Sequence, residues 1–132
     1  MKLHKPLVSA LLLCVLGAPF AATAADGDWK RGRVYYRMVC TACHTEPAGG
    51  GKAIAPSEKT MAEWAAYIKA DKHAKGKDSL KFYSSKEYRA KIKATNKAAE
   101  KYADVPDQDL LNDIKAFVTK GAKDGDSPAG CN

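Results

Sequence analysis

The sequence predicts an all-α domain. Apolar residues recur at intervals of three and four along most of residues 28–121, which is the spacing of one face of a helix. Two segments begin with a capping box, in which Thr or Ser is followed three residues later by Glu. No segment shows the strict alternation of apolar and polar residues that is typical of a half-buried strand.

The first expected helix follows Asp28, a residue type that caps helix N-termini. Val34, Tyr35 and Met38 then recur at helical spacing up to Cys40. This helix therefore leads directly into a cysteine motif.

The second expected helix begins with the capping box of Thr60 and Glu63 and runs to about residue 72. Its apolar face has the spacing i, i+3, i+4 and i+7 and consists of Met61, Trp64, Ala65 and Ile68. The preceding segment, Thr45 to Glu58, is predicted as a loop because it has no period and contains two prolines and three consecutive glycines.

A third, basic helix is expected from the second capping box, Ser84 with Glu87, and its pattern extends as far as Tyr102. The last helix begins after Pro106 and is ended by Gly121. A single apolar stripe runs along this last helix and consists of Leu110, Ile114, Phe117 and Val118.

The motif after the first helix is Cys40-Thr41-Ala42-Cys43-His44, a C-x-x-C-H run. This spacing is the attachment signature of c-type haem, in which two thiols bond to the vinyl groups of one porphyrin and the next residue places an imidazole on the iron. Cys40 and Cys43 are therefore the expected thioether residues of one covalent haem c, and His44 is the expected proximal ligand. A thioredoxin-like redox motif is disfavoured, because it would need a βαβ context that the sequence lacks. A zinc site is disfavoured as well, because it would have to combine the adjacent Cys43 and His44 with the distant Cys131.

Residues 1–25 have the features of a secretory signal peptide that is cleaved on export. Lys2 and Lys5 precede an apolar run from Leu7 to Gly17, and small residues follow at 22–24. The run is too short to span a bilayer, which needs about 20 apolar residues. We therefore expect a periplasmic protein with no stable membrane anchor, one domain over residues 26–122 and a flexible tail over residues 123–132.

These features resemble the class I monohaem cytochromes c of bacteria. In that family the first helix carries Gly-x-x-x-aromatic-x-x-x-Cys-x-x-Cys-His, and Gly32 and Tyr36 stand at those offsets before Cys40. The resemblance implies a small cytochrome c-like helical domain over residues 26–122, wrapped round one covalently attached haem, in which Gly32 lets the first and last helices approach closely. It also implies that the Pro56 carbonyl bonds the second nitrogen of the ligand histidine, with a plain turn role as the alternative.

The sequence departs from this family at the sixth iron ligand. Class I members usually supply a methionine shortly before the last helix, but residues 93–106 contain neither Met nor His. His73 and Met61 are the two candidates, and Lys97, water or no ligand are the alternatives. Met38 is excluded because it lies only two residues from Cys40, on the proximal side.

The predicted function is that of a monohaem c-type cytochrome that shuttles single electrons between redox partners, and not that of an enzyme. Two strong axial ligands would leave no iron position open to a substrate. An accessible sixth position would instead favour a small haem enzyme or a sensor of gas or peroxide. A fixed electron-transfer subunit of a respiratory complex is a third possibility.

Charge and cysteine usage bear on partners. The net charge is +7, and it becomes +5 without Lys2 and Lys5 of the signal peptide. Residues 69–101 contain eleven basic and four acidic side chains, which indicates redox partners with an acidic docking surface. Nucleic acid is not expected as a partner of an exported haem protein. Cys131 would remain as a lone thiol, which allows a disulfide-linked dimer.

Overall fold

The computed structural model describes residues 26–44 and 51–128. Helices form all the regular secondary structure within these residues. This confirms the all-α prediction. The α-helices are α1 (Trp29–Met38), α2 (Met61–Ala70), α3 (Leu80–Ser84), α4 (Lys86–Ile92), α5 (Lys97–Lys101) and α6 (Asp107–Lys120). Short 3-10 turns span Cys40–Ala42, Pro56–Glu58 and Ala74–Gly76. The predicted signal peptide, residues 45–50 of the predicted loop and Cys131 lie outside the described residues.

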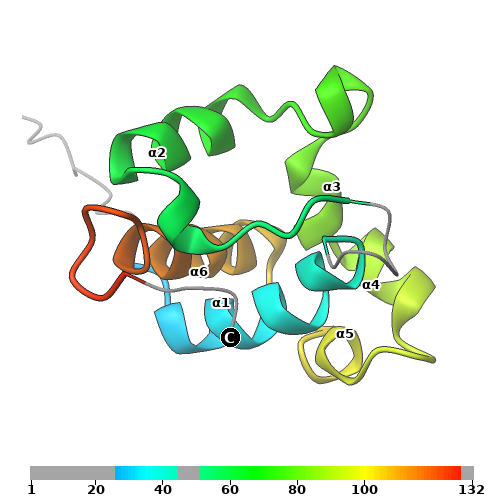
Figure 1. The fold of residues 1–132 in the computed structure, drawn as a ribbon. Coiled ribbons are helices and arrows are strands. Elements are labelled where there is room, and N and C mark those ends of the chain that lie inside the picture. Colours follow the sequence, from blue (N-terminus) through cyan, green and yellow to red (C-terminus); the bar gives the residue numbers. More distant parts are fainter. Residues whose placement is uncertain (1–25, 45–50, 129–132) are drawn as a thin grey trace, which may run out of the picture.

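Helix α6 lies between α1 and α2 and packs against both (Figure 1). Its contact with α1 is a contact between backbones, because a Cβ placed on Gly32 would overlap the carbonyl oxygen of Asp113. Only glycine allows this approach. The close helix pair that the resemblance implied at Gly32 is therefore present.

A buried carboxylate fixes the same crossing. Asp113 of α6 is 1% exposed, forms an ion pair with Arg31 of α1 and accepts a hydrogen bond of 2.6 Å from the backbone N–H of Asp28. The Asp28 carboxylate in turn caps α1 by accepting hydrogen bonds from the N–H groups of Lys30 and Arg31. The predicted cap at Asp28 is confirmed, and the start of α1 is held directly to the middle of α6.

The buried face of α1 differs from the predicted one. Tyr35, Tyr36 and Val39 are at most 9% exposed, whereas Val34 and Met38 are 40% and 48% exposed. Because Gly32 is the contact point with α6, the inward positions are those three, four and seven residues beyond it. The apolar stripe predicted for the last helix is confirmed, since Leu110, Ile114, Phe117 and Val118 are all buried.

The capping box of Thr60 and Glu63 is present, and α2 ends at Ala70, two residues before the predicted end. The single helix predicted from Ser84 to Tyr102 is wrong, because this region forms α4 and α5. Ser84 is the last residue of α3, and Ser85 caps α4 instead. Asn96 breaks the pattern by capping α5, while its side-chain amide donates to the Met38 carbonyl at 2.7 Å.

The segment after α6, which is the beginning of the predicted tail, forms hydrogen bonds with the rest of the fold. The Lys123 N–H donates to the Lys59 carbonyl at 2.9 Å, and the Asp124 carboxylate accepts from the Met61 N–H at 2.7 Å. The Ser127 N–H donates to the Lys120 carbonyl at 3.1 Å. Backbone and side-chain groups of residues 123–127 are thus bonded to the segment that begins α2 and to the end of α6. None of the helices within residues 26–44 and 51–128 has the length and apolar character needed to cross a membrane.

We expect Gly32→Ala to destabilise the protein by about 2 kcal/mol, because the added methyl group forces α1 away from α6. Urea unfolding followed by circular dichroism measures the change. The matched control is Val34→Ala on the exposed side of the same helix, which should change stability by less than about 0.5 kcal/mol. Equal effects of the two substitutions would contradict the backbone contact.

Candidate functional site

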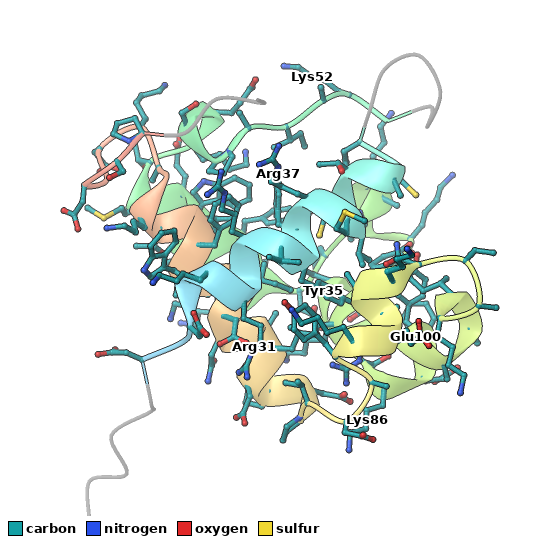
Figure 2. The ribbon with its side chains drawn as sticks, turned by 90° about the horizontal axis from the view of Figure 1, so that it is seen from below. Arg31, Tyr35, Arg37, Lys52, Lys86 and Glu100 are labelled. Carbon is teal, nitrogen blue, oxygen red and sulfur yellow. The ribbon has the colours of Figure 1, made fainter. Side chains whose placement is uncertain are left out.

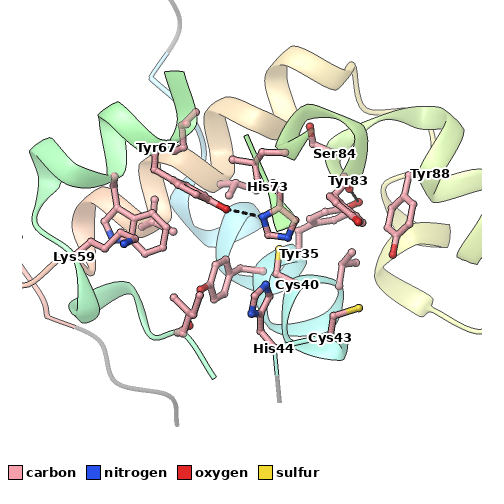
Figure 3. A pocket seen from close by; sticks show the side chains of 18 residues that line it. Tyr35, Cys40, Cys43, His44, Lys59, Tyr67, His73, Tyr83, Ser84 and Tyr88 are labelled. Carbon is pink, nitrogen blue, oxygen red and sulfur yellow. Dashed lines mark hydrogen bonds between the residues drawn. The ribbon is translucent and has the colours of Figure 1, made fainter. Parts of the chain in front are cut away.

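A cavity of about 220 Å³ lies between α1, α2, α3 and α6 and is partly open to solvent (Figure 3). Its walls are mainly apolar and aromatic. Cys40, Cys43, His44 and His73 all line it, so the structure brings together the complete C-x-x-C-H motif and one of the two candidate sixth ligands.

The motif reaches the cavity because α1 continues into the 3-10 turn Cys40–Ala42. The N–H groups of Cys43 and His44 both donate to the Cys40 carbonyl, at 3.3 and 3.2 Å. This tight turn places two thiols and an imidazole on one side of the chain. Burial raises the pKa of the Cys40 thiol to about 12, whereas a reactive redox dithiol depends on a lowered thiol pKa.

The imidazole of His44 is oriented by a backbone group. Its Nδ1 lies 2.9 Å from the Lys52 carbonyl oxygen. Because a carbonyl only accepts, Nδ1 carries the proton and Nε2 keeps its lone pair. The prediction for Pro56 is wrong, since the Pro56 carbonyl accepts instead from the Trp64 indole N–H at 2.7 Å.

Gly51 makes the Lys52 contact possible. A Cβ on Gly51 would lie 2.7 Å from the Cys43 carbonyl oxygen and 3.2 Å from His44 Nδ1. The Gly51 N–H also donates to the Cys43 carbonyl at 3.0 Å. The run of three glycines marked a loop in the sequence, but nothing in the sequence indicated that Gly51 packs against His44.

His73 faces His44 from the other side of the cavity (Figure 3). Its Nδ1 shares a hydrogen bond of 2.5 Å with the Tyr67 hydroxyl, which leaves Nε2 as its second nitrogen. Burial, together with the neighbouring His44, lowers the pKa of His73. The neutral form that a metal ligand needs is therefore favoured.

The separation of the two imidazoles fits two ligands of one metal ion. Their ring centres lie 5.6 Å apart. Metal–imidazole bonds are about 2 Å long, so the ring centres of two imidazoles on opposite sides of one ion lie about 6 Å apart. Each ring has its Nδ1 engaged elsewhere, so both Nε2 atoms are available as the ligating atoms.

The other ligand candidates do not line the cavity. Met61 is 40% exposed in the first turn of α2, and the same helix turns Trp64 and Ile68 inward instead. Met38 is 48% exposed, and Lys97 is exposed at the start of α5. Of the residues considered from the sequence, the structure therefore places only His73 opposite His44.

A tightly bonded turn carries His73. Three residues have positive φ angles, which residues other than glycine rarely adopt: Asp71 (51°), Ala74 (47°) and Lys75 (60°). The Asp71 carboxylate holds this turn by accepting from the Ser79 hydroxyl and the Lys81 N–H, each at 2.8 Å. Burial raises the pKa of Asp71, but these hydrogen bonds outweigh it and lower the pKa overall.

Two tyrosines near His73 were not identified from the sequence. Tyr67 bonds the imidazole directly, and the Tyr83 ring lies 5.3 Å from it while its hydroxyl donates to Asp78. This hydrogen bond lowers the pKa of Asp78 and raises that of Tyr83 to about 12. The helical spacing of Tyr67 after Trp64 was a usable signal for an inward position, but not for a bond to His73.

Comparison with family models, with curated proteins and with solved structures found no match for this chain. Within the described ranges, no three His, Cys, Asp or Glu side chains gather as a metal-binding group.

We expect acid to loosen the turn that carries His73. The pKa of Asp71 is below its ordinary value of 3.8, so its stabilising effect is complete above that pH and is lost as the pH falls through the lowered pKa. The urea midpoint should therefore fall less between pH 6 and pH 3 in Asp71→Asn than in the wild type. Asp104→Asn, which changes an exposed carboxylate, is the control and should follow the wild type.

Proposed function

We propose that this chain is a monohaem c-type cytochrome that carries single electrons in the periplasm. Cys40 and Cys43 would hold one haem c covalently, and His44 and His73 would be its two axial ligands. The main support is the pair of imidazoles in the thiol-lined cavity, whose ring centres lie 5.6 Å apart. We also propose that the helical domain is a cytochrome c-like domain.

The residues present fit such a group. Addition of each thiol across a vinyl double bond forms a carbon–sulfur bond and passes the thiol hydrogen to the second vinyl carbon, so no oxidant is consumed. When bound, haem supplies an iron centre that gains and loses one electron. The aromatic and apolar walls would limit the access of water to the bound group, and the two histidines would hold its iron through their Nε2 atoms.

The arrangement favours electron transfer over catalysis. Each histidine Nδ1 is committed to a hydrogen bond, with Lys52 or with Tyr67, and each Nε2 would ligate the iron, so neither imidazole would be left as a free general acid or base. Among the described residues that line the cavity there is no arginine to assist a bound peroxide. A carrier needs only the fixed ligands and a path to the surface.

Partners would approach the basic side of the cavity. Lys59 lines the cavity. Residues 69–101, which include His73, α4 and α5, contain eleven basic side chains. Long-range attraction to an acidic redox partner raises the rate of encounter and weakens as ionic strength rises.

A carbon monoxide titration tests the proposal. The purified protein should retain haem through acid–acetone extraction, and its ferrous spectrum should not respond to carbon monoxide because His73 holds the sixth position. His73→Ala should bind the gas rapidly, since the substitution opens that position.

Met61→Ala is the matched control and should behave as the wild type. Loss of haem on extraction would contradict covalent attachment. Rapid gas binding by the wild type would instead support a haem enzyme or sensor, and gas binding only by Met61→Ala would assign the sixth position to Met61.

The bond between Tyr67 and His73 gives a second test. With His73 Nδ1 protonated, the Tyr67 oxygen accepts the bond and makes the imidazole a stronger donor to the metal. We expect Tyr67→Phe to raise the reduction potential, as measured by spectroelectrochemical titration. Tyr88→Phe, which changes a cavity residue that has no hydrogen bond to His73, should leave the potential nearly unchanged. A lowered potential in Tyr67→Phe would contradict this direction of the bond.

A further inference from the structure

The side of α1 that faces away from α6 combines exposed apolar side chains with cations. We call it the outer face of α1, and it consists of Trp29, Lys30, Arg33, Val34 and Arg37, which together line a shallow surface depression. Trp29 is 36% exposed and Val34 40% exposed, although both are large hydrophobic residues. The face therefore offers apolar side chains and cations to one binding partner.

The outer face is turned away from the cavity. Gly32, Tyr35, Tyr36 and Val39 form the opposite side of the same helix, and the last three line the cavity. In Figure 1, α1 lies at the lower side of the molecule with α2 at the opposite side, and Figure 2 views α1 from below. A partner that exchanges electrons at the cavity would not need to touch the outer face.

The cations of this face have no acidic partners within residues 26–44 and 51–128. Lys30, Arg33 and Arg37 form no ion pair with any of the described residues. The ammonium groups of Lys30 and Lys120 lie 5.9 and 5.4 Å from the centre of the Trp29 ring. An exposed indole is therefore flanked by positive charges that form no ion pair with a carboxylate in the part of the chain that the structure describes.

We propose that the outer face of α1 binds the surface of an anionic phospholipid membrane. Tryptophan prefers the level of the lipid headgroups, where its ring is partly buried and its N–H stays near water. Arginine and lysine side chains on the same face attract phosphate groups. A shallow face that follows one helix can lie along a lipid surface, whereas a protein hot spot usually fills a pocket in its partner.

Membrane binding by this face would leave the cavity side free for a redox partner. The attachment is peripheral, because the apolar contribution comes from two side chains and the rest is electrostatic. The inference concerns only surface residues and does not rest on the identity of the bound cofactor. It can fail while the proposed electron carrier stands, and the reverse is equally possible.

Vesicle co-sedimentation tests this inference. The purified holoprotein should bind vesicles of phosphatidylcholine mixed with phosphatidylglycerol at physiological ionic strength, and should not bind vesicles of phosphatidylcholine alone. Arg33→Gln/Arg37→Gln should weaken the partitioning by about thirtyfold, because each removed charge is a lost attraction to the anionic surface. Trp29→Ser should also weaken it, since the indole no longer enters the headgroup layer.

The matched control is Lys86→Gln/Lys93→Gln, which removes two exposed charges, one at the start of α4 and one at its C-cap, and leaves the outer face intact. Binding like that of the wild type in this control supports the proposal. Equal weakening in both double variants would overturn it, because the binding would then reflect net charge alone. Absence of vesicle binding, with binding to a polyglutamate surface that depends on Arg33 and Arg37, would overturn it in favour of an acidic protein partner.

Discussion

The backbone contact between α1 and α6 at Gly32 determines the geometry of the rest of the structure. The two helix backbones approach so closely there that a side chain at Gly32 would overlap the Asp113 carbonyl, and the ion pair of Arg31 with Asp113 fixes the rotation of α1 against α6. That rotation sends Tyr35 and Tyr36 inward and directs the end of α1 into the cavity. The same rotation leaves the outer face of α1 in solvent, so the site and the proposed membrane surface have a common origin.

The cavity is built from two parts of the chain that reach it by different means. His44 follows from its place one residue after Cys43, in a turn that continues α1. His73 depends on a turn with positive φ angles that is held by Asp71 and by the Tyr67 hydroxyl. The proposed haem site thus combines a ligand placed by its neighbour in the sequence with one that hydrogen bonds across six, eight and ten residues position.

The two sides of the molecule suit two different contacts. The cavity side carries the basic residues of the His73 segment and α4, and the outer face of α1 carries a separate cluster of cations around Trp29. Under the proposals made above, a carrier could stay near a membrane through α1 while it exchanges electrons from the cavity side. Spatial separation would keep the two contacts from competing.

The sequence by itself determined the helical class, the caps at Asp28 and Thr60, the stripe of α6 and the C-x-x-C-H motif, because these features depend on neighbours within a few residues. Only the tertiary structure decided that Val34 is exposed, that Asn96 splits the third predicted helix and that His73 rather than Met61 faces His44. It also showed that the Lys52 carbonyl, and not the Pro56 carbonyl, lies within hydrogen-bonding distance of His44 Nδ1. Every residue has the same backbone carbonyl, so the sequence does not indicate which carbonyl bonds His44. The rotation of a helix is set by the helix against which it packs, so the sequence does not indicate the rotation either.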